Sequence, residues 1–305
     1  MNPEELISEI HSVAPLSKVS SLFLLNAVLF AALSGATHTR MHWVSELAWF
    51  GAFAFAILAI IKLLNRLAPE LPSWVARPVH WMHALVFEVL AFAAVALLRF
   101  VPGNLSPKGT GSRPMLLVHG YCNHGSVWAY LQRMWAKTGV GPVYTINLGH
   151  PFRSIREYAE HIACRAAEIR AETGHSELIL IGHSMGGLVS AFYAAKLAQP
   201  GTVTAVITLG SPLGGTHMAQ LALGPNGREM RRASVFVSEL KTLMAAKPNI
   251  RFYHLGTKTD QLVIPSEAAL LGNDPAREFV LDDIGHASLL FSPRVAAKVS
   301  EWLHK

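Results

Sequence analysis

Charged residues are scarce in this sequence of 305 residues, since Asp, Glu, Lys and Arg make up only 15% of it. The formal net charge at pH 7 is +6, yet the sequence has no long run of Lys and Arg and no alternation of basic with aromatic residues. Those patterns are typical of proteins that bind nucleic acid. We therefore predict no nucleic-acid partner, and the scattered positive charge suits solubility or attraction to anionic lipid.

Cysteine is also scarce, because the chain contains only Cys122 and Cys164. Two cysteines cannot build a disulfide framework, and they do not form a Cys-x-x-Cys pair. Histidine pairs such as His80 with His83 lack a Cys or carboxylate partner at the spacing of a metal site. We therefore predict no metal ion.

Apolar residues are in excess at 51%, and the excess lies mostly before Pro102. Three apolar stretches cover residues 19–37, 47–61 and 82–98. A helix that crosses a bilayer needs about 20 such residues. We therefore expect residues 1–102 to be an N-terminal membrane region with up to three transmembrane helices. Two alternatives are a bundle of buried helices and, for the first stretch, a cleavable signal peptide.

The third stretch carries one carboxylate, Glu88, which is costly inside lipid. We expect a structural role for it, paired with a neighbouring helix and with His83 as a candidate partner. Lys and Arg occur both in the loop of residues 62–77 and after the third stretch. Their distribution therefore does not fix the orientation in the membrane.

The pattern changes after a stretch at residues 103–113 that is rich in Pro, Gly and Ser, which we interpret as a linker. Short apolar runs then alternate with helical patterns, which predicts βαβ units and an α/β fold with a mostly parallel sheet and helices on both faces. The predicted strands cover residues 115–119, 143–148, 178–181, 203–209, 251–255 and 278–281. The predicted helices cover residues 126–137, 155–172, 188–197 and 291–303.

One serine lies between glycines where a strand is predicted to become a helix. The sequence Gly182-His183-Ser184-Met185-Gly186 fits the pattern Gly-x-Ser-x-Gly, and Leu-Ile-Leu-Ile precedes it. A strand that turns at once into a helix strains the serine backbone and exposes its hydroxyl, while glycines avoid collisions on either side. The pattern therefore predicts a nucleophilic serine at Ser184.

A serine nucleophile needs a base and an acid that orients the base. In this kind of fold they follow in the order Ser, acid, His. Asp260 and His286 each come shortly after a predicted strand, so both would lie at the same sheet edge as Ser184. We predict these residues as catalytic and expect Asp282 and Asp283 to be less suitable acids, because they are too close in sequence to His286.

An ester or amide transition state also needs donors for its oxyanion. The residue after the serine, Met185, would offer one backbone N–H. The turn His119-Gly120 follows the first predicted strand, so the N–H of Tyr121 is the natural second donor.

The region 114–305 resembles the α/β-hydrolases, and within them the bacterial lipase and esterase group. The resemblance rests on the segments "LLVHGYCN", "GHSMGGLVS", "TLGSPLGGT", "TDQLVIP" and "GHASLLFSPRV". It implies a serine hydrolase with the triad Ser184, Asp260 and His286, oxyanion donors at Tyr121 and Met185, and no cofactor. With the apolar region, it suggests a multi-pass protein of a bacterial inner membrane that acts on lipid or other acyl esters.

Residues 211–249 are long for a connection between strands and hold both apolar residues and arginines. We expect either a lid over an acyl pocket or a plain pair of connecting helices. Two other functions remain open: a thioesterase or acyltransferase that uses the same triad, and a non-catalytic membrane interaction module. The linker also predicts that removal of residues 1–101 spares activity on short soluble esters.

Overall fold

The computed structural model describes residues 73–304 apart from Asn273, together with Gly51, Ala54, residues 56–63 and Asn65. The apolar stretch at residues 19–37 lies outside the described residues, and the stretch at 47–61 is described only in part. The chain divides into two compact units, Met1–Val79 and His80–Lys305. The catalytic candidates all lie in the second unit.

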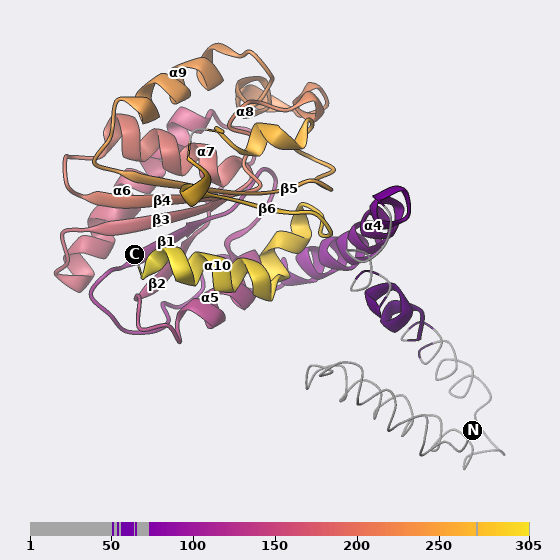
Figure 1. The fold of residues 1–305 in the computed structure, drawn as a ribbon. Helices are drawn as coiled ribbons and strands as arrows, with labels where there is room; N and C mark the ends of the chain where they lie inside the picture. The colour runs from indigo at the N-terminus through magenta and orange to yellow at the C-terminus, as the bar shows by residue number, and fades with distance from the viewer. Residues whose placement is uncertain are drawn as a thin grey trace, which may run out of the picture. The chain divides into compact units, whose positions relative to one another are not determined.

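Six parallel strands form the sheet of the second unit (Figure 1). Their order across the sheet is β2-β1-β3-β4-β5-β6. The chain begins at β1, next to the edge strand β2, moves out to β2, and then passes back over β1 to β3 and on to β6. This single reversal of direction is the doubly wound arrangement, and the parallel strands bring their carboxyl ends to one edge. The strands are β1 (Met115–Val118), β2 (Val143–Ile146), β3 (Leu178–His183), β4 (Val203–Leu209), β5 (Arg251–Thr257) and β6 (Glu278–Leu281).

Helices cover both faces of the sheet (Figure 1). On one face α6 (Ile155–Thr173), α7 (Met185–Phe192) and α9 (Val235–Ala245) share a buried apolar cluster with the strands. On the other face α5 (Ala129–Trp135) and α10 (Pro293–Leu303) do the same, and Trp135 Nε1–H donates to Ala296 O at 3.1 Å. The central strands β1 and β3 are buried along their whole length, as their unbroken apolar runs predict.

The predicted α/β class with a parallel sheet is confirmed, and the predicted strands agree with the observed ones to within about two residues. The main differences concern helix ends. The helix after the serine begins directly at Met185 and ends in a π-helical turn at Tyr193–Leu197, and the last helix begins at Pro293 after its N-cap Ser292. Short 3-10 segments complete the unit: η2 (Gly125–Trp128), η5 (Ser266–Ala269), η6 (Pro275–Arg277) and η7 (Ala287–Phe291).

The apolar helix α4 (Ser73–Leu98) belongs mostly to the catalytic unit, because the boundary between the units falls at Val79 and His80. Residues 76–98 are long and apolar enough to cross a membrane. One face of the helix nevertheless packs on the catalytic unit through Ala84, Glu88, Ala91 and Val95. The unit therefore begins upstream of the linker expected at residues 103–113. The helix removed by deleting residues 1–101 would include this packed face.

The segment 211–249 contains η4 (His217–Gln220), α8 (Gly224–Glu229) and α9. Polar contacts fasten α8 to the start of α6, since Glu229 accepts hydrogen bonds from Ser154 Oγ–H and Ile155 N–H, both at 2.6 Å. Helix α9 buries Phe236, Val237, Leu240 and Met244 over α7. The second half of the segment is thus part of the core, while the residues around Leu221 are exposed.

We expect Leu240→Ala to lower the free energy of unfolding by about 2–5 kcal/mol, because Leu240 is fully buried and its loss leaves a cavity. Leu221→Ala is the matched control: Leu221 is 77% exposed, so the change should stay within about 0.5 kcal/mol. Chemical denaturation of the full chain measures both. Equal and small effects would contradict the placement of α9 in the core.

Candidate active site

Ser184 lies in the turn between β3 and α7 with strained backbone angles, φ 55° and ψ −128°. Two glycines make this turn possible. A Cβ atom on Gly182 would lie 2.3 Å from Gly187 N, and one on Gly186 would lie 2.2 Å from Val118 O. Both clashes involve backbone, which cannot move aside, so the flanking positions accept only glycine. The sequence therefore specifies the turn that presents the hydroxyl.

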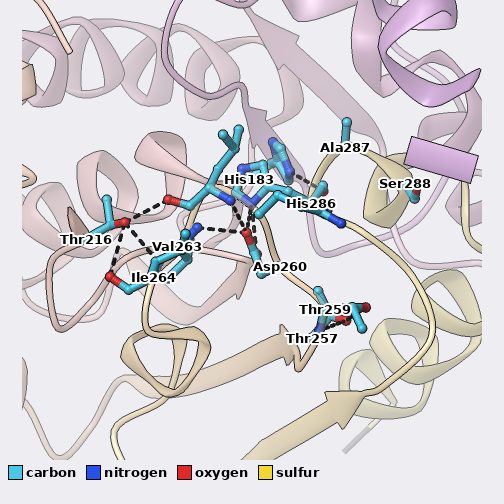
Figure 2. A network of polar contacts seen from close by, with 12 residues as sticks. His183, Thr216, Thr257, Thr259, Asp260, Val263, Ile264, His286, Ala287 and Ser288 are labelled. Atoms are coloured by element: carbon cyan, nitrogen blue, oxygen red, sulfur yellow. Dashed lines mark hydrogen bonds and ion pairs between the residues drawn. The ribbon is translucent and has the colours of Figure 1, made fainter. Parts of the chain in front are cut away.

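Asp260 and His286 form a buried pair (Figure 2). His286 Nδ1 lies 2.9 Å from Asp260 Oδ2, and the two side chains are almost fully buried. Asp260 Oδ1 also accepts hydrogen bonds from Leu262 N–H at 2.8 Å and Val263 N–H at 2.7 Å. These amides stabilise the charged carboxylate, which in turn fixes the imidazole with its Nδ1–H toward Asp260 and leaves Nε2 to take up a proton.

The pKa of His286 lies above the usual histidine value despite its burial. Burial of the imidazole lowers the pKa, but the charge of Asp260, its hydrogen bond and the charge of Glu88 raise it and prevail. A buried carboxylate that favours imidazolium suits a base that becomes charged during a reaction.

The two rival carboxylates have other partners. Asp283 accepts a hydrogen bond from Arg294, and Asp282 Oδ2 lies 3.8 Å from His80 Nδ1. Asp260 is the carboxylate that contacts the imidazole of His286.

The residue before the serine touches the histidine loop, which the sequence analysis did not foresee. The ring centroids of His183 and His286 are 4.7 Å apart, and His183 Nε2–H donates to His286 O at 3.1 Å. Burial, with the neighbouring His286, lowers the pKa of His183 to about 3, so this ring is neutral. The only sequence signal at His183 is its place in the Gly-x-Ser-x-Gly pattern, and that pattern does not indicate this contact.

Ser184 lies at the same sheet edge as Asp260 and His286, at the carboxyl ends of the strands. Ser184 N–H donates to Leu209 O at 2.9 Å, and the next residue, Gly210, borders the pair. A Cβ atom there would lie 3.3 Å from His286 Nδ1 and 3.4 Å from Asp260 Oδ2. In the described part of the chain no hydrogen bond joins Ser184 Oγ to His286. Catalytic hydrogen bonds are often long before substrate binds, so this contact stays a prediction.

The predicted oxyanion donors flank the serine. A Cβ atom on Gly120 would lie 2.9 Å from Ser184 Cβ, so the loop after β1 passes directly beside the serine. Tyr121 follows, and among the described residues its N–H has no hydrogen-bond acceptor. The Tyr121 side chain is fixed to the cap, as we call the segment 211–249. Tyr121 Oη donates to Leu223 O at 3.1 Å and accepts from Leu223 N–H at 2.9 Å. Met185 lies on the other side, at the first residue of α7.

Within residues 73–304 and the other described positions, no group of three or more His, Cys, Asp or Glu side chains is arranged to hold a metal ion. Cys164 is exposed and Cys122 is partly buried, and both are free thiols.

Comparisons with known proteins agree with this geometry. Residues 113–255 match the model of the alpha/beta hydrolase fold family. A triacylglycerol lipase of Burkholderia plantarii is 30% identical over 190 residues, which cover 57% of this chain and 51% of the lipase. A triacylglycerol lipase of Pseudarthrobacter phenanthrenivorans is 31% identical over 150 residues, which cover 45% of this chain and 46% of the lipase. The chain thus spans about half the length of the curated relatives it matches.

Two solved structures share the fold at lower identity. The mature lipase BlEst2 of Bacillus licheniformis has a TM-score of 0.56 and 18% identity, with 66% of this chain and 98% of that chain covered. Lipase B of Aspergillus fumigatus has a TM-score of 0.55 and 17% identity, with 68% of this chain and 57% of that chain covered. Residues 113–255 thus match the α/β-hydrolase fold family, and the chain is similar to triacylglycerol lipases over about half of their length.

Proposed function

We propose that this chain is a serine hydrolase that cleaves carboxylic esters through an acyl-serine intermediate, with Ser184, Asp260 and His286 as its triad. The observation that carries the proposal is the buried contact between His286 Nδ1 and Asp260 Oδ2 at the same sheet edge as the strained Ser184. The lipase relatives support an ester as the substrate.

In the proposed reaction, Ser184 Oγ attacks the ester carbonyl carbon and its proton passes to His286 Nε2. The carbonyl oxygen becomes an oxyanion that accepts hydrogen bonds from the N–H groups of Tyr121 and Met185. The imidazolium, stabilised by Asp260, then gives the proton to the departing alkoxide, which leaves as the alcohol. Water attacks the acyl-serine with His286 again as the base, and the carboxylic acid and free Ser184 are released.

The same acyl-serine would serve a thioesterase or an acyltransferase. These differ from the proposed hydrolase only in the leaving group or in the acceptor of the acyl group. The lipase relatives favour an oxygen ester and water as the acceptor. A non-catalytic membrane module is less well supported, because such a module has no need of a buried Asp–His pair beside a strained serine.

We further propose that the substrate is a lipid ester and that the chain is bound to a bacterial inner membrane through residues 1–102. Helix α4 supports this within the described residues. Glu88 is buried, whereas every exposed side chain of α4 between residues 81 and 97 is apolar, among them Leu85, Val89 and Phe92. An exposed apolar strip of this kind is typical of a membrane-contacting helix. The apolar Leu221 and Leu223 of the cap are also exposed and are suited to contact with acyl chains.

Ser184→Ala is expected to reduce kcat/KM for a short soluble ester by roughly 10³-fold or more, because the nucleophile is lost. Ser238→Ala is the control, since Ser238 is an exposed serine on α9 far from the sheet edge. A p-nitrophenyl ester assay on the detergent-solubilised chain measures both. Full activity in Ser184→Ala would rule out the mechanism.

The pH dependence should follow the raised pKa of His286. The base must be neutral, so kcat/KM should fall as pH drops through that pKa, with a midpoint above the usual histidine value of 6.5. Asp260→Asn should lower kcat by about 10⁴-fold and move the midpoint to lower pH, because burial then acts without the adjacent charge. A midpoint unchanged by the substitution would contradict the assigned pair.

The lipid proposal predicts that loss of apolar side chains on α4 lowers the rate on a membrane-embedded ester but not the rate on a soluble ester. Leu85→Ser combined with Val89→Ser should leave the rate on a short soluble ester within about twofold and lower the rate on an ester embedded in anionic vesicles by about tenfold, since two apolar contacts with lipid are lost. Leu197→Ser, a comparably exposed apolar site on the π-helical turn, is the control and should change neither rate. Equal loss on both substrates would argue against membrane contact by α4.

A further inference from the structure

Glu88 is the single carboxylate of the largely apolar helix α4, and its hydrogen-bond partners lie 199 and 200 residues later in the chain. It is only 3% exposed. Ala287 N–H donates to Glu88 Oε1 at 2.7 Å, and Ser288 donates to Glu88 Oε2 through its N–H at 3.0 Å and its Oγ–H at 2.8 Å. Burial of a carboxylate is costly unless hydrogen bonds compensate it, and these three donors do so.

The residue before His286 is a glycine, Gly285, which leaves room for the Glu88 carboxylate. A Cβ atom on Gly285 would lie 2.3 Å from Glu88 Oε2, so any larger residue there would displace the carboxylate or the loop. The residues Gly285, Ala287 and Ser288 flank His286 on both sides. Glu88 therefore contacts the segment that carries the imidazole, although it does not touch the imidazole itself in the contacts described here.

Three side chains fix the backbone around His286. Gln261 Oε1 accepts from His286 N–H at 3.4 Å, and His183 Nε2–H donates to His286 O at 3.1 Å. Glu88 holds the next two amides. Figure 2 shows His183, Ala287 and Ser288 grouped around His286 and Asp260. With the backbone held on both sides, the imidazole can meet Asp260 without searching many conformations.

From this geometry we propose that Glu88 is a positioning residue for the catalytic histidine: the apolar helix α4 holds the His286 loop in place through its one carboxylate. The inference rests on the proposed function of His286 as the base. It assigns α4 a part in catalysis in addition to any contact with lipid. The charge of Glu88 also acts on the imidazole, because it is one of the causes that raise the pKa of His286.

A purely structural role for Glu88 predicts a different outcome. In that case its loss would lower stability but leave the folded fraction with normal kinetics. The titratable groups around His286 are Asp260, Glu88 and His183, and burial lowers the pKa of His183 to about 3. Removal of the Glu88 charge alone should therefore lower the pKa of His286, and removal of its oxygens should also loosen the loop.

The test uses the full chain with Glu88→Gln and Glu88→Ala. Glu88→Gln keeps one carbonyl acceptor and loses the charge, while Glu88→Ala loses both. We expect kcat for a short soluble ester to fall about tenfold or less in the first and further in the second, with KM unchanged. Leu197→Ala, an exposed apolar residue on the π-helical turn, is the control and should match wild type.

The second readout is the pKa of His286, followed by NMR in histidine-labelled protein, with thermal unfolding recorded for each variant. We expect the pKa of His286 to fall in Glu88→Gln relative to Leu197→Ala. An unchanged pKa, or a lower melting temperature with unchanged kcat in the folded fraction, would overturn the inference. A wild-type chain without esterase activity would overturn the proposed function instead, and the NMR titration would still decide whether Glu88 acts on His286.

Discussion

The buried contact between Asp260 and His286 is the interaction on which the account of this molecule depends. A carboxylate and an imidazole removed from water are stable together only if each has further partners. Here the carboxylate has the amides of Leu262 and Val263, and the loop of the imidazole is held by His183, Gln261 and Glu88. The parallel sheet supplies the common edge at which these loops meet the strained turn of Ser184. Fold and site are therefore linked by one set of polar contacts above the strand ends.

Much of the catalytic unit could be predicted because its signals are local. Uninterrupted apolar runs mark buried parallel strands, and the glycines around Ser184 mark a turn in which no side chain fits. The chain order of serine, acid and histidine indicated Asp260 and His286, whose side chains are in contact in the structure. The cap was harder to predict: α9 has the same composition whether it forms a lid or part of the core, and only its packing on α7 distinguishes the two.

The least predictable features are contacts between segments far apart in the sequence. Nothing local to Glu88 indicates that its partners are Ala287 and Ser288, because hydropathy describes α4 only as an apolar helix with a single carboxylate. A neighbouring helix was the expected partner, and the loop after the catalytic histidine supplies the hydrogen bonds instead. For the same reason the composition change at residues 103–113 does not indicate that the second compact unit already begins at His80. An apolar helix can therefore hold a loop that carries a candidate active-site residue.

A crystal structure of the chain after reaction with a fluorophosphonate would test the central claim most directly. The account predicts a bond between phosphorus and Ser184 Oγ, with a phosphonyl oxygen about 2.7–3.1 Å from the amide nitrogens of Tyr121 and Met185. It also predicts that His286 Nε2 faces Ser184 Oγ while Nδ1 keeps its contact with Asp260. Phosphonylation at another residue, or an imidazole turned away from the adduct, would contradict it.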